Sequence, residues 1–208
     1  MKLVFVGGAQ GAGKSTLVAL AAQKLREEGI SVFHVDPGEF IREYCARKKL
    51  GRFSDLNFKE QMRVNRAVLK EVKPVLDKHD LVFVSTHYAV NTVKSKPDEL
   101  TDVPLRMPLA EPLVDKASHL VLLDSDPEEV YRRIKGDSRR PNACEDVSRS
   151  VIANKLSARA LAKTRKLPLT VIHNRRDLEK ETVGVLVKIA KEVIRKYFAL
   201  ELWFRLVF

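Results

Sequence analysis

Short apolar runs alternate with amphipathic stretches along most of the chain. The runs are rich in β-branched and aromatic residues, which indicates buried strands. These predicted strands cover residues 2–6, 30–35, 81–84, 119–123 and 169–173. Between them, apolar residues recur at three- or four-residue spacing, which predicts helices. These predicted helices cover about residues 14–28, 37–50, 58–76, 111–117, 127–135, 146–166 and 178–199. The alternation predicts an α/β fold with a doubly wound five-stranded parallel sheet flanked by helices.

Several predicted helices carry specific end signals. Gly29 is placed to end the first helix as a C′ residue, and Gly51 is placed to end the second. Asp36 and Asp126 each precede a proline, as an N-cap precedes a proline at the first helical position. The helix boundaries therefore have a chemical basis beyond the apolar spacing.

The stretch from residue 88 to 110 breaks this regular pattern. Pro97, Pro104 and Pro108 stand there among charged residues. Such a composition predicts a long irregular loop. Loops of this length in compact domains are usually functional or disordered.

The stretch from Gly8 to Ser15 reads GAQGAGKS, which fits the phosphate-binding P-loop pattern. It lies between a predicted strand and a predicted helix, as that loop requires. Its glycines let backbone N–H groups converge on a concavity at a helix N-terminus, where an anion is favoured. In such a loop Lys14 would reach the β- and γ-phosphates, and the Ser15 hydroxyl would ligate Mg²⁺. The chain is therefore predicted to be a P-loop NTPase that binds a nucleoside triphosphate. The predicted ATP-binding residues of the loop are Gly8, Ala9, Gln10, Gly11, Ala12, Gly13, Lys14, Ser15 and Thr16.

Composition narrows the class of protein. A chain of 208 residues that is 45% hydrophobic is predicted to form one domain with a real core. The net charge of +11 fits cationic clamps for a polyanionic substrate, and it also fits contact with nucleic acid. Because the basic residues are scattered over several segments, the first interpretation is favoured. The sequence has no signal-peptide pattern and no apolar run long enough to span a membrane, so a cytoplasmic enzyme is predicted.

Basic residues gather after the fourth predicted strand. They are Arg132, Arg133, Lys135, Arg139 and Arg140. Arginines can clamp the charge that spreads over a phosphoryl group during its transfer. The segment of about 136–145 is therefore predicted to be a short lid over the triphosphate. The alternative is a solvated basic turn.

Polar residues follow the third predicted strand at Ser85, Thr86 and His87. If this strand lies beside the first, Ser85 occupies the place where P-loop enzymes commonly hold Mg²⁺ with an aspartate. The Ser85 hydroxyl could hold a metal-bound water but adds no charge. His87 is either a substrate contact or a histidine packed at a strand end.

A second phosphate-bearing substrate would need cations opposite the P-loop. The segment from Gly38 and Phe40 to Arg52 is a candidate, together with Arg63 and Arg66 on one helix face. Taken singly, each arginine is also explained as an ordinary surface charge. At the end of the fifth predicted strand, His173 and Asn174 could offer groups to a base.

Taken in order, the motifs GGAQGAGKST, VDPGEF, STHYAV, HLVLLDSDPEEVYRRIKGDSRR and VIHNRRD resemble the archaeal-type adenylate kinases, which are P-loop nucleoside monophosphate kinases. The resemblance covers residues 1 to about 196. It implies transfer of the ATP γ-phosphate to AMP with Mg²⁺ as cofactor, monophosphate-binding helices at about 37–79, and possible homotrimers. It assigns catalysis to Lys14, Arg133, Arg139 and Arg140. It places His173 and Asn174 beside the ATP adenine. It assigns the acceptor to Gly38, Phe40, Thr86 and His87 and the metal to Ser15, while Arg52 stays a candidate cation for the acceptor and Ser85 a candidate for the metal shell.

The chain departs from that family at three places. Ser85 stands where the family has an aspartate, the loop at 88–110 is longer, and residues 197–208 are unusually apolar. The last segment is predicted to pack on its own domain or on a neighbouring subunit. Two alternative functions follow from these departures. One is a P-loop kinase for another nucleotide or a small metabolite, and the other is an adenylate-kinase-like NTPase that assists assembly of an RNA–protein particle.

Overall fold

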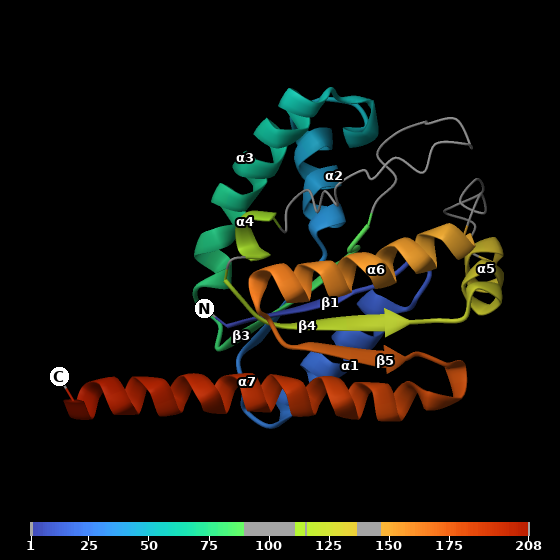
Figure 1. Ribbon diagram of the computed structural model, residues 1–208. Helices are drawn as coiled ribbons and strands as arrows, with labels where there is room; N and C mark the ends of the chain where they lie inside the picture. Colours follow the sequence, from blue (N-terminus) through green and yellow to red (C-terminus); the bar gives the residue numbers. More distant parts are fainter. Residues whose placement is uncertain (1, 90–110, 115, 137–146, 208) are drawn as a thin grey trace.

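The computed structural model describes residues 2–89, 111–114, 116–136 and 147–207. Its centre is a five-stranded parallel sheet with the strand order β2-β3-β1-β4-β5 (Figure 1). The strands are β1 (Leu3–Gly7), β2 (Val32–Val35), β3 (Leu81–Thr86), β4 (Ala117–Asp124) and β5 (Leu169–His173). The helices are α1 (Lys14–Glu27), α2 (Pro37–Arg47), α3 (Phe58–Leu76), α4 (Glu111–Val114), α5 (Pro127–Lys135), α6 (Val147–Arg165) and α7 (Glu179–Val207), with short 3₁₀ turns η1 (Phe53–Asp55) and η2 (Arg176–Leu178). The predicted α/β fold is confirmed.

Helices cover both faces of the sheet. Helices α1 and α7 pack on one face, and α2, α3 and α6 lie over the other (Figure 1). The chain passes from β1 through β2 to β3 on one side, and then crosses to β4 and β5 on the other. Crevices at the carboxyl ends of strands form at such a switch in strand order. The carboxyl ends of β1, β3 and β4 are therefore where a ligand is expected.

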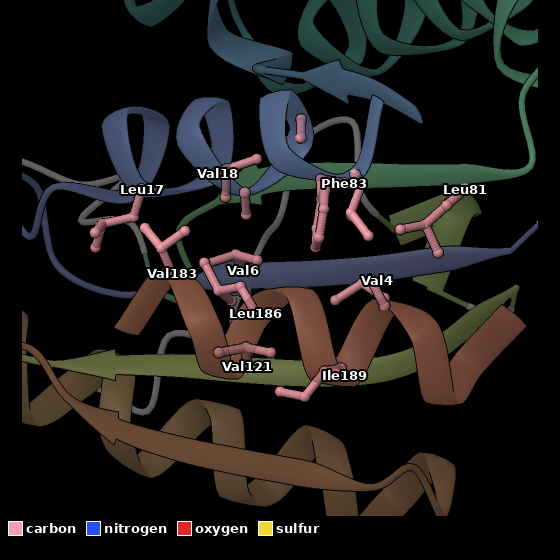
Figure 2. Packing of buried hydrophobic residues seen from close by; sticks show 14 of the residues in the cluster. Val4, Val6, Leu17, Val18, Leu81, Phe83, Val121, Val183, Leu186 and Ile189 are labelled. Carbon is pink, nitrogen blue, oxygen red and sulfur yellow. The ribbon is translucent and has the colours of Figure 1, made fainter. Parts of the chain in front are cut away.

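The core under α1 and α7 is fully apolar (Figure 2). Val4 and Val6 of β1 lie between Val18 of α1 and Leu186 of α7, and none of these four side chains is exposed to solvent. A buried Val or Leu side chain contributes roughly 1.5–3 kcal/mol. This layer holds β1 rigidly, and β1 leads directly into the P-loop.

The helix ends confirm some sequence signals and correct one. Gly29 has φ 81° and ends α1 as predicted, because the Ile30 N–H donates to Leu25 O and closes a Schellman motif. Helix α2 does not extend to residue 50. It ends at Arg47, and Lys49, with φ 55°, takes the left-handed C′ position ahead of the glycine that was predicted to end it. The Leu50 N–H donates to Cys45 O and closes the helix end around this non-glycine residue.

Two further sequence predictions need correction. The apolar spacing over 58–76 predicts that Phe58 is part of a buried stripe on this helix, but its side chain is 54% exposed. The stripe instead begins at Val64 and continues through Val68. Helix α7 reaches Val207, beyond the predicted end near 199, and its C-terminal part extends past the sheet (Figure 1). Almost every residue of this end segment is apolar, so its periodicity alone did not show whether the helix continues or gives way to a loop.

Some predicted features lie outside the described residues. These are the loop at 90–110 and residues 137–146, which hold most of the predicted lid together with Arg139 and Arg140. For the apolar C-terminal segment, the structure describes the backbone helix but not the side chains from residue 200 onward. Within the described ranges, the helices are too short or too polar to cross a membrane.

Candidate active site

The P-loop joins β1 to α1 with the curled backbone that the motif predicts. Gly11 and Gly13 have φ values of 79° and 78°, in the left-handed region that favours glycine. Gly13 is also the N-cap of α1, so the loop ends on a helix N-terminus. This arrangement aims backbone donors and the positive end of the helix dipole at the concavity.

Lys14 is buried and reaches back over the loop. Its Nζ atom donates to Gly8 O at 3.0 Å and to Ala9 O at 2.6 Å. The ammonium is therefore held beside the concavity. Phosphate oxygens bound there would compete with Gly8 O and Ala9 O for its N–H donors. The position of this cation follows directly from the loop backbone.

His87 lies against the P-loop. Its Nδ1 atom donates to Gly8 O at 3.0 Å, because a carbonyl can only accept, and it lies 3.5 Å from Lys14 Nζ. The adjacent Thr86 is 8% exposed and ends β3 in register with Gly7. The two residues that the resemblance places at the acceptor thus stand at the edge of the phosphate cradle.

Ser85 lies beside β1, since β3 pairs with β1 and Ser85 is in register with Val6. Ser85 was predicted to occupy the magnesium position only if its strand lies beside the first strand, and β3 does lie beside β1. However, the Ser85 hydroxyl is buried and lies 2.7 Å from His34 Nε2, with which it shares a hydrogen bond. Burial lowers the pKa of His34, although the nearby Asp36 carboxylate partly opposes this effect. His34 is accordingly neutral at pH 7, and Ser85 is engaged with it.

Sequence reasoning placed Asp36 at the start of α2 but assigned it no part in the site. The structure shows that Asp36 is the N-cap of α2 and also contacts the P-loop. Asp36 Oδ1 accepts from the Gly38 N–H at 3.0 Å as the predicted N-cap, while Oδ2 accepts from the Ser15 hydroxyl at 3.3 Å. The missed signal is its place directly after a strand, at the carboxyl edge of a parallel sheet.

A cavity of about 680 Å³ opens on the α5 side of the P-loop. It is lined by Gly13, Thr16, Leu17, Glu129, Arg132, Arg133, Asn174, Arg175, Asp177 and Glu179. This volume lies in the range of small-molecule sites. Three predicted groups, the P-loop, Arg133 and Asn174, therefore meet around one space.

Each of these groups is positioned by a neighbour. Arg133 pairs with Glu129, one turn earlier on α5. Asn174 is 4% exposed and its Nδ2 donates to Ala12 O at 2.7 Å, so it braces the P-loop from β5. His173 differs, because its side chain is 77% exposed and only Nδ1 approaches Asp124, at 3.5 Å from Oδ2.

The remaining predicted acceptor residues lie on the β2 side of the molecule. Gly38 and Phe40 are in α2, and Arg52 is exposed just before η1. Arg63 and Arg66 are exposed on α3. None of these five is among the described residues that line the cavity beside α5. The structure thus separates the cavity beside α5 from the side where the acceptor residues were predicted.

Tyr88 packs against the end of β1 that leads into the P-loop, a contact that the sequence did not predict. Its ring is fully buried, and its hydroxyl donates to Val121 O at 2.9 Å and lies 3.2 Å from Phe5 O. A Cβ atom on Gly7 would lie 2.1 Å from the Tyr88 ring, so Gly7 leaves the space that the ring fills. The Tyr88 N–H donates to Asn154 Oδ1 at 2.7 Å. Burial raises the pKa of the Tyr88 phenol far above its usual value, so it stays protonated.

Known proteins with similar sequences are adenylate kinases of archaea. The chain is 26% identical over 197 residues to the adenylate kinase of Methanocaldococcus jannaschii, covering 91% of this chain and 98% of that one. It is 26% identical over 196 residues to that of Methanococcus vannielii, with the same coverage, and 28% identical over 148 residues to that of Methanoculleus marisnigri, covering 69% of this chain and 73% of that one. The resemblance noted from the motifs is confirmed.

Solved structures with a similar fold include two shikimate kinases. The enzyme of Acinetobacter baumannii in complex with shikimate superimposes with a TM-score of 0.52 at 18% identity, covering 90% of this chain and 93% of that one. The enzyme of Bacteroides thetaiotaomicron gives a TM-score of 0.50 at 17% identity, covering 91% and 98%. At this identity the likeness concerns the fold.

The sheet, the P-loop and the adenylate kinase relatives identify the chain as a P-loop phosphotransferase. A family model described as AAA domain matches residues 7–152, which is more than half of the chain. The chain therefore belongs to the AAA domain family.

Proposed function

We propose that the protein is an ATP-dependent nucleoside monophosphate kinase that transfers the γ-phosphate of ATP directly to AMP, giving two ADP. The observation that carries this proposal is the arrangement around the P-loop. A cavity with Arg133 and Asn174 opens on one side of the loop, and the β3 end with Thr86 and His87 stands on the other. The adenylate kinase relatives support AMP as the acceptor.

On the donor side, the P-loop backbone and Lys14 bind the triphosphate of ATP. The cavity beside α5 receives the nucleoside, with Asn174 at its floor and Arg133 at its wall. Arg139 and Arg140 close over the phosphates as lid arginines. Together these cations neutralise charge on the transferring phosphoryl group, which is the main work of catalysis in this chemistry.

On the acceptor side, α2 and the β3 end hold the monophosphate. Gly38, Phe40 and Arg52 contribute from α2 and the segment after it, and Thr86 and His87 contribute from β3. An acceptor phosphate is already anionic, so the reaction requires no dedicated general base. Positioning of the two reacting groups supplies much of the rate enhancement.

A Mg²⁺ ion is the cofactor of this reaction, and when bound it neutralises charge on the β- and γ-phosphates. Mg²⁺ takes oxygen ligands, commonly one or two carboxylates with phosphate oxygens and water. The Ser15 hydroxyl and the Asp36 carboxylate meet at the P-loop, and both face solvent enough to receive such an ion. The residues present therefore fit a magnesium site.

An acceptor screen tests the proposed function. Purified protein with ATP and Mg²⁺ is expected to form ADP faster when AMP is added than with CMP, UMP, GMP, shikimate or buffer alone. Product analysis should show that two ADP form for each ATP and AMP consumed, because transfer is direct. If another compound stimulates ADP formation more than AMP does, that compound replaces AMP as the proposed acceptor.

The same screen separates the RNA-assembly alternative. If no nucleoside monophosphate stimulates ADP formation, the proposed function is wrong. Slow ATP hydrolysis together with RNA binding that weakens steeply as salt rises would then favour the assembly NTPase.

A further inference from the structure

Ser85 poses a problem for charge balance at the metal site. It stands at the carboxyl end of the strand beside β1, where a carboxylate would face the ion, but it brings a neutral hydroxyl. Ser85 is 3% exposed, and its hydroxyl shares a 2.7 Å hydrogen bond with His34. Neither a serine hydroxyl nor an imidazole carries a negative charge, so the Ser85–His34 pair adds none. A magnesium site at the P-loop therefore needs its carboxylate from another element.

Asp36 stands next to Ser85 in the sheet. Strands β2 and β3 are paired in parallel up to Val35 and Val84, so Asp36 and Ser85 are the next residues on neighbouring strands. Asp36 is thus one strand further from β1 than Ser85. Its side chain nevertheless reaches the P-loop, since Oδ2 lies 3.3 Å from Ser15 Oγ.

The two carboxylate oxygens of Asp36 have separate tasks. Oδ1 is held by the Gly38 N–H at 3.0 Å, which fixes the side chain against the first turn of α2. Oδ2 is directed at Ser15, the residue whose hydroxyl the P-loop motif assigns to Mg²⁺. A carboxylate fixed through one oxygen and presented through the other is pre-organised for a cation.

From these contacts we infer that Asp36 supplies the carboxylate of the magnesium site and acts with Ser15 in place of the missing carboxylate at Ser85. This inference rests on the proposed function for the presence of a metal–nucleotide complex. It gives α2 a second role, since the helix that is proposed to bind the acceptor begins at a group that holds the metal. It also gives the hydrogen-bonded Ser85–His34 pair a supporting role beside Asp36.

Asp36→Asn is the test variant, because asparagine keeps the N-cap acceptor and removes only the charge. Asp126→Asn is a matched control. Asp126 is the N-cap of α5, its Oδ1 accepts from the Glu128 N–H at 2.8 Å, and a proline follows it as one follows Asp36. Asp36→Ser is a second test variant that also keeps a capping oxygen, should the amide disturb folding. Thermal melts of all three variants are compared with the wild type.

The readout is metal linkage rather than activity. Calorimetry measures the dissociation constant of a non-hydrolysable ATP analogue, with an NH group bridging the β- and γ-phosphates, once with excess Mg²⁺ and once with EDTA. The ratio of these two constants reports how strongly the bound metal favours the complex. In the wild type Mg²⁺ is expected to tighten binding. In Asp36→Asn and Asp36→Ser this gain should fall by about 10-fold or more, in line with losses at metal-site partners.

Binding in EDTA should change less than twofold in the Asp36 variants, and Asp126→Asn should match the wild type in both buffers. The inference is overturned if the Asp36 variants keep the wild-type ratio, if Asp126→Asn loses it equally, or if Mg²⁺ does not tighten binding to the wild type. Since no acceptor is present, these outcomes are independent of the acceptor screen. Failure of AMP as acceptor with an Asp36-dependent ratio would reject the proposed reaction but leave the metal assignment intact.

Discussion

Lys14→Ala is expected to reduce phosphoryl transfer by about a thousandfold, or ~4 kcal/mol of transition-state stabilisation. Lys14 Nζ is already held inside the P-loop by Gly8 O and Ala9 O, so the charge needs little reorganisation to meet the phosphates. Alanine removes the cation and the donor that these two carbonyls accept from. Initial rates with saturating ATP and acceptor measure the effect.

Lys24→Ala is the matched control for this prediction. Lys24 lies on the same helix, α1, but its exposed side chain is in the last turn, at the opposite end from the loop. Its substitution should leave the rate within about twofold, since surface changes of this kind have small effects. Near-normal activity of Lys14→Ala would contradict the assignment of the P-loop as the reaction centre.

Tyr88→Ala is expected to lower the free energy of unfolding by roughly 3–5 kcal/mol, as for other large aromatic residues cut back in a core. The ring is fully buried against the Gly7 backbone, and its hydroxyl donates to Val121 O. Its removal leaves a cavity below the start of the P-loop. Because a domain of this kind is stable by only about 5–15 kcal/mol, the loss is a large part of the total. Urea unfolding followed by circular dichroism measures it.

Tyr131→Ala is the control, because it removes a tyrosine that is not packed in the core. Tyr131 is 42% exposed on α5, and its substitution should change the free energy of unfolding by about 0.5 kcal/mol or less. If Tyr88→Ala unfolds at the same urea concentration as the wild type, the ring does not support the loop as argued.

Most of the fold was predictable because it depends on local patterns. Fully apolar runs such as Leu81–Val84 are short and rich in β-branched and aromatic residues, which indicated buried strands. Errors occurred where local signals were weak. Lys49 took a left-handed conformation that Gly51 was expected to provide, and Phe58 fitted the helical spacing without being buried.

The candidate site was predictable only in part. The P-loop residues are contiguous, so their spacing alone predicted the loop that the structure contains. Asn174 was weakly indicated, and the structure brings it to Ala12 across the sheet. The role of Tyr88 had no sequence signal of its own, and that of Asp36 had only its place directly after a strand, because each depends on a contact with a distant segment.

The sequence by itself determined the α/β class, the P-loop between a strand and a helix, and the resemblance to archaeal adenylate kinases, because each rests on residues close together in the chain. Only the tertiary structure decided which side chains meet at the loop. Strand order brings β3 beside β1 and β2 beside β3, and this places Asp36, 21 residues from Ser15 in sequence, against its hydroxyl. Contacts of this kind depend on how strands pair and on which side chains fill the space between them, and neither is encoded in local periodicity.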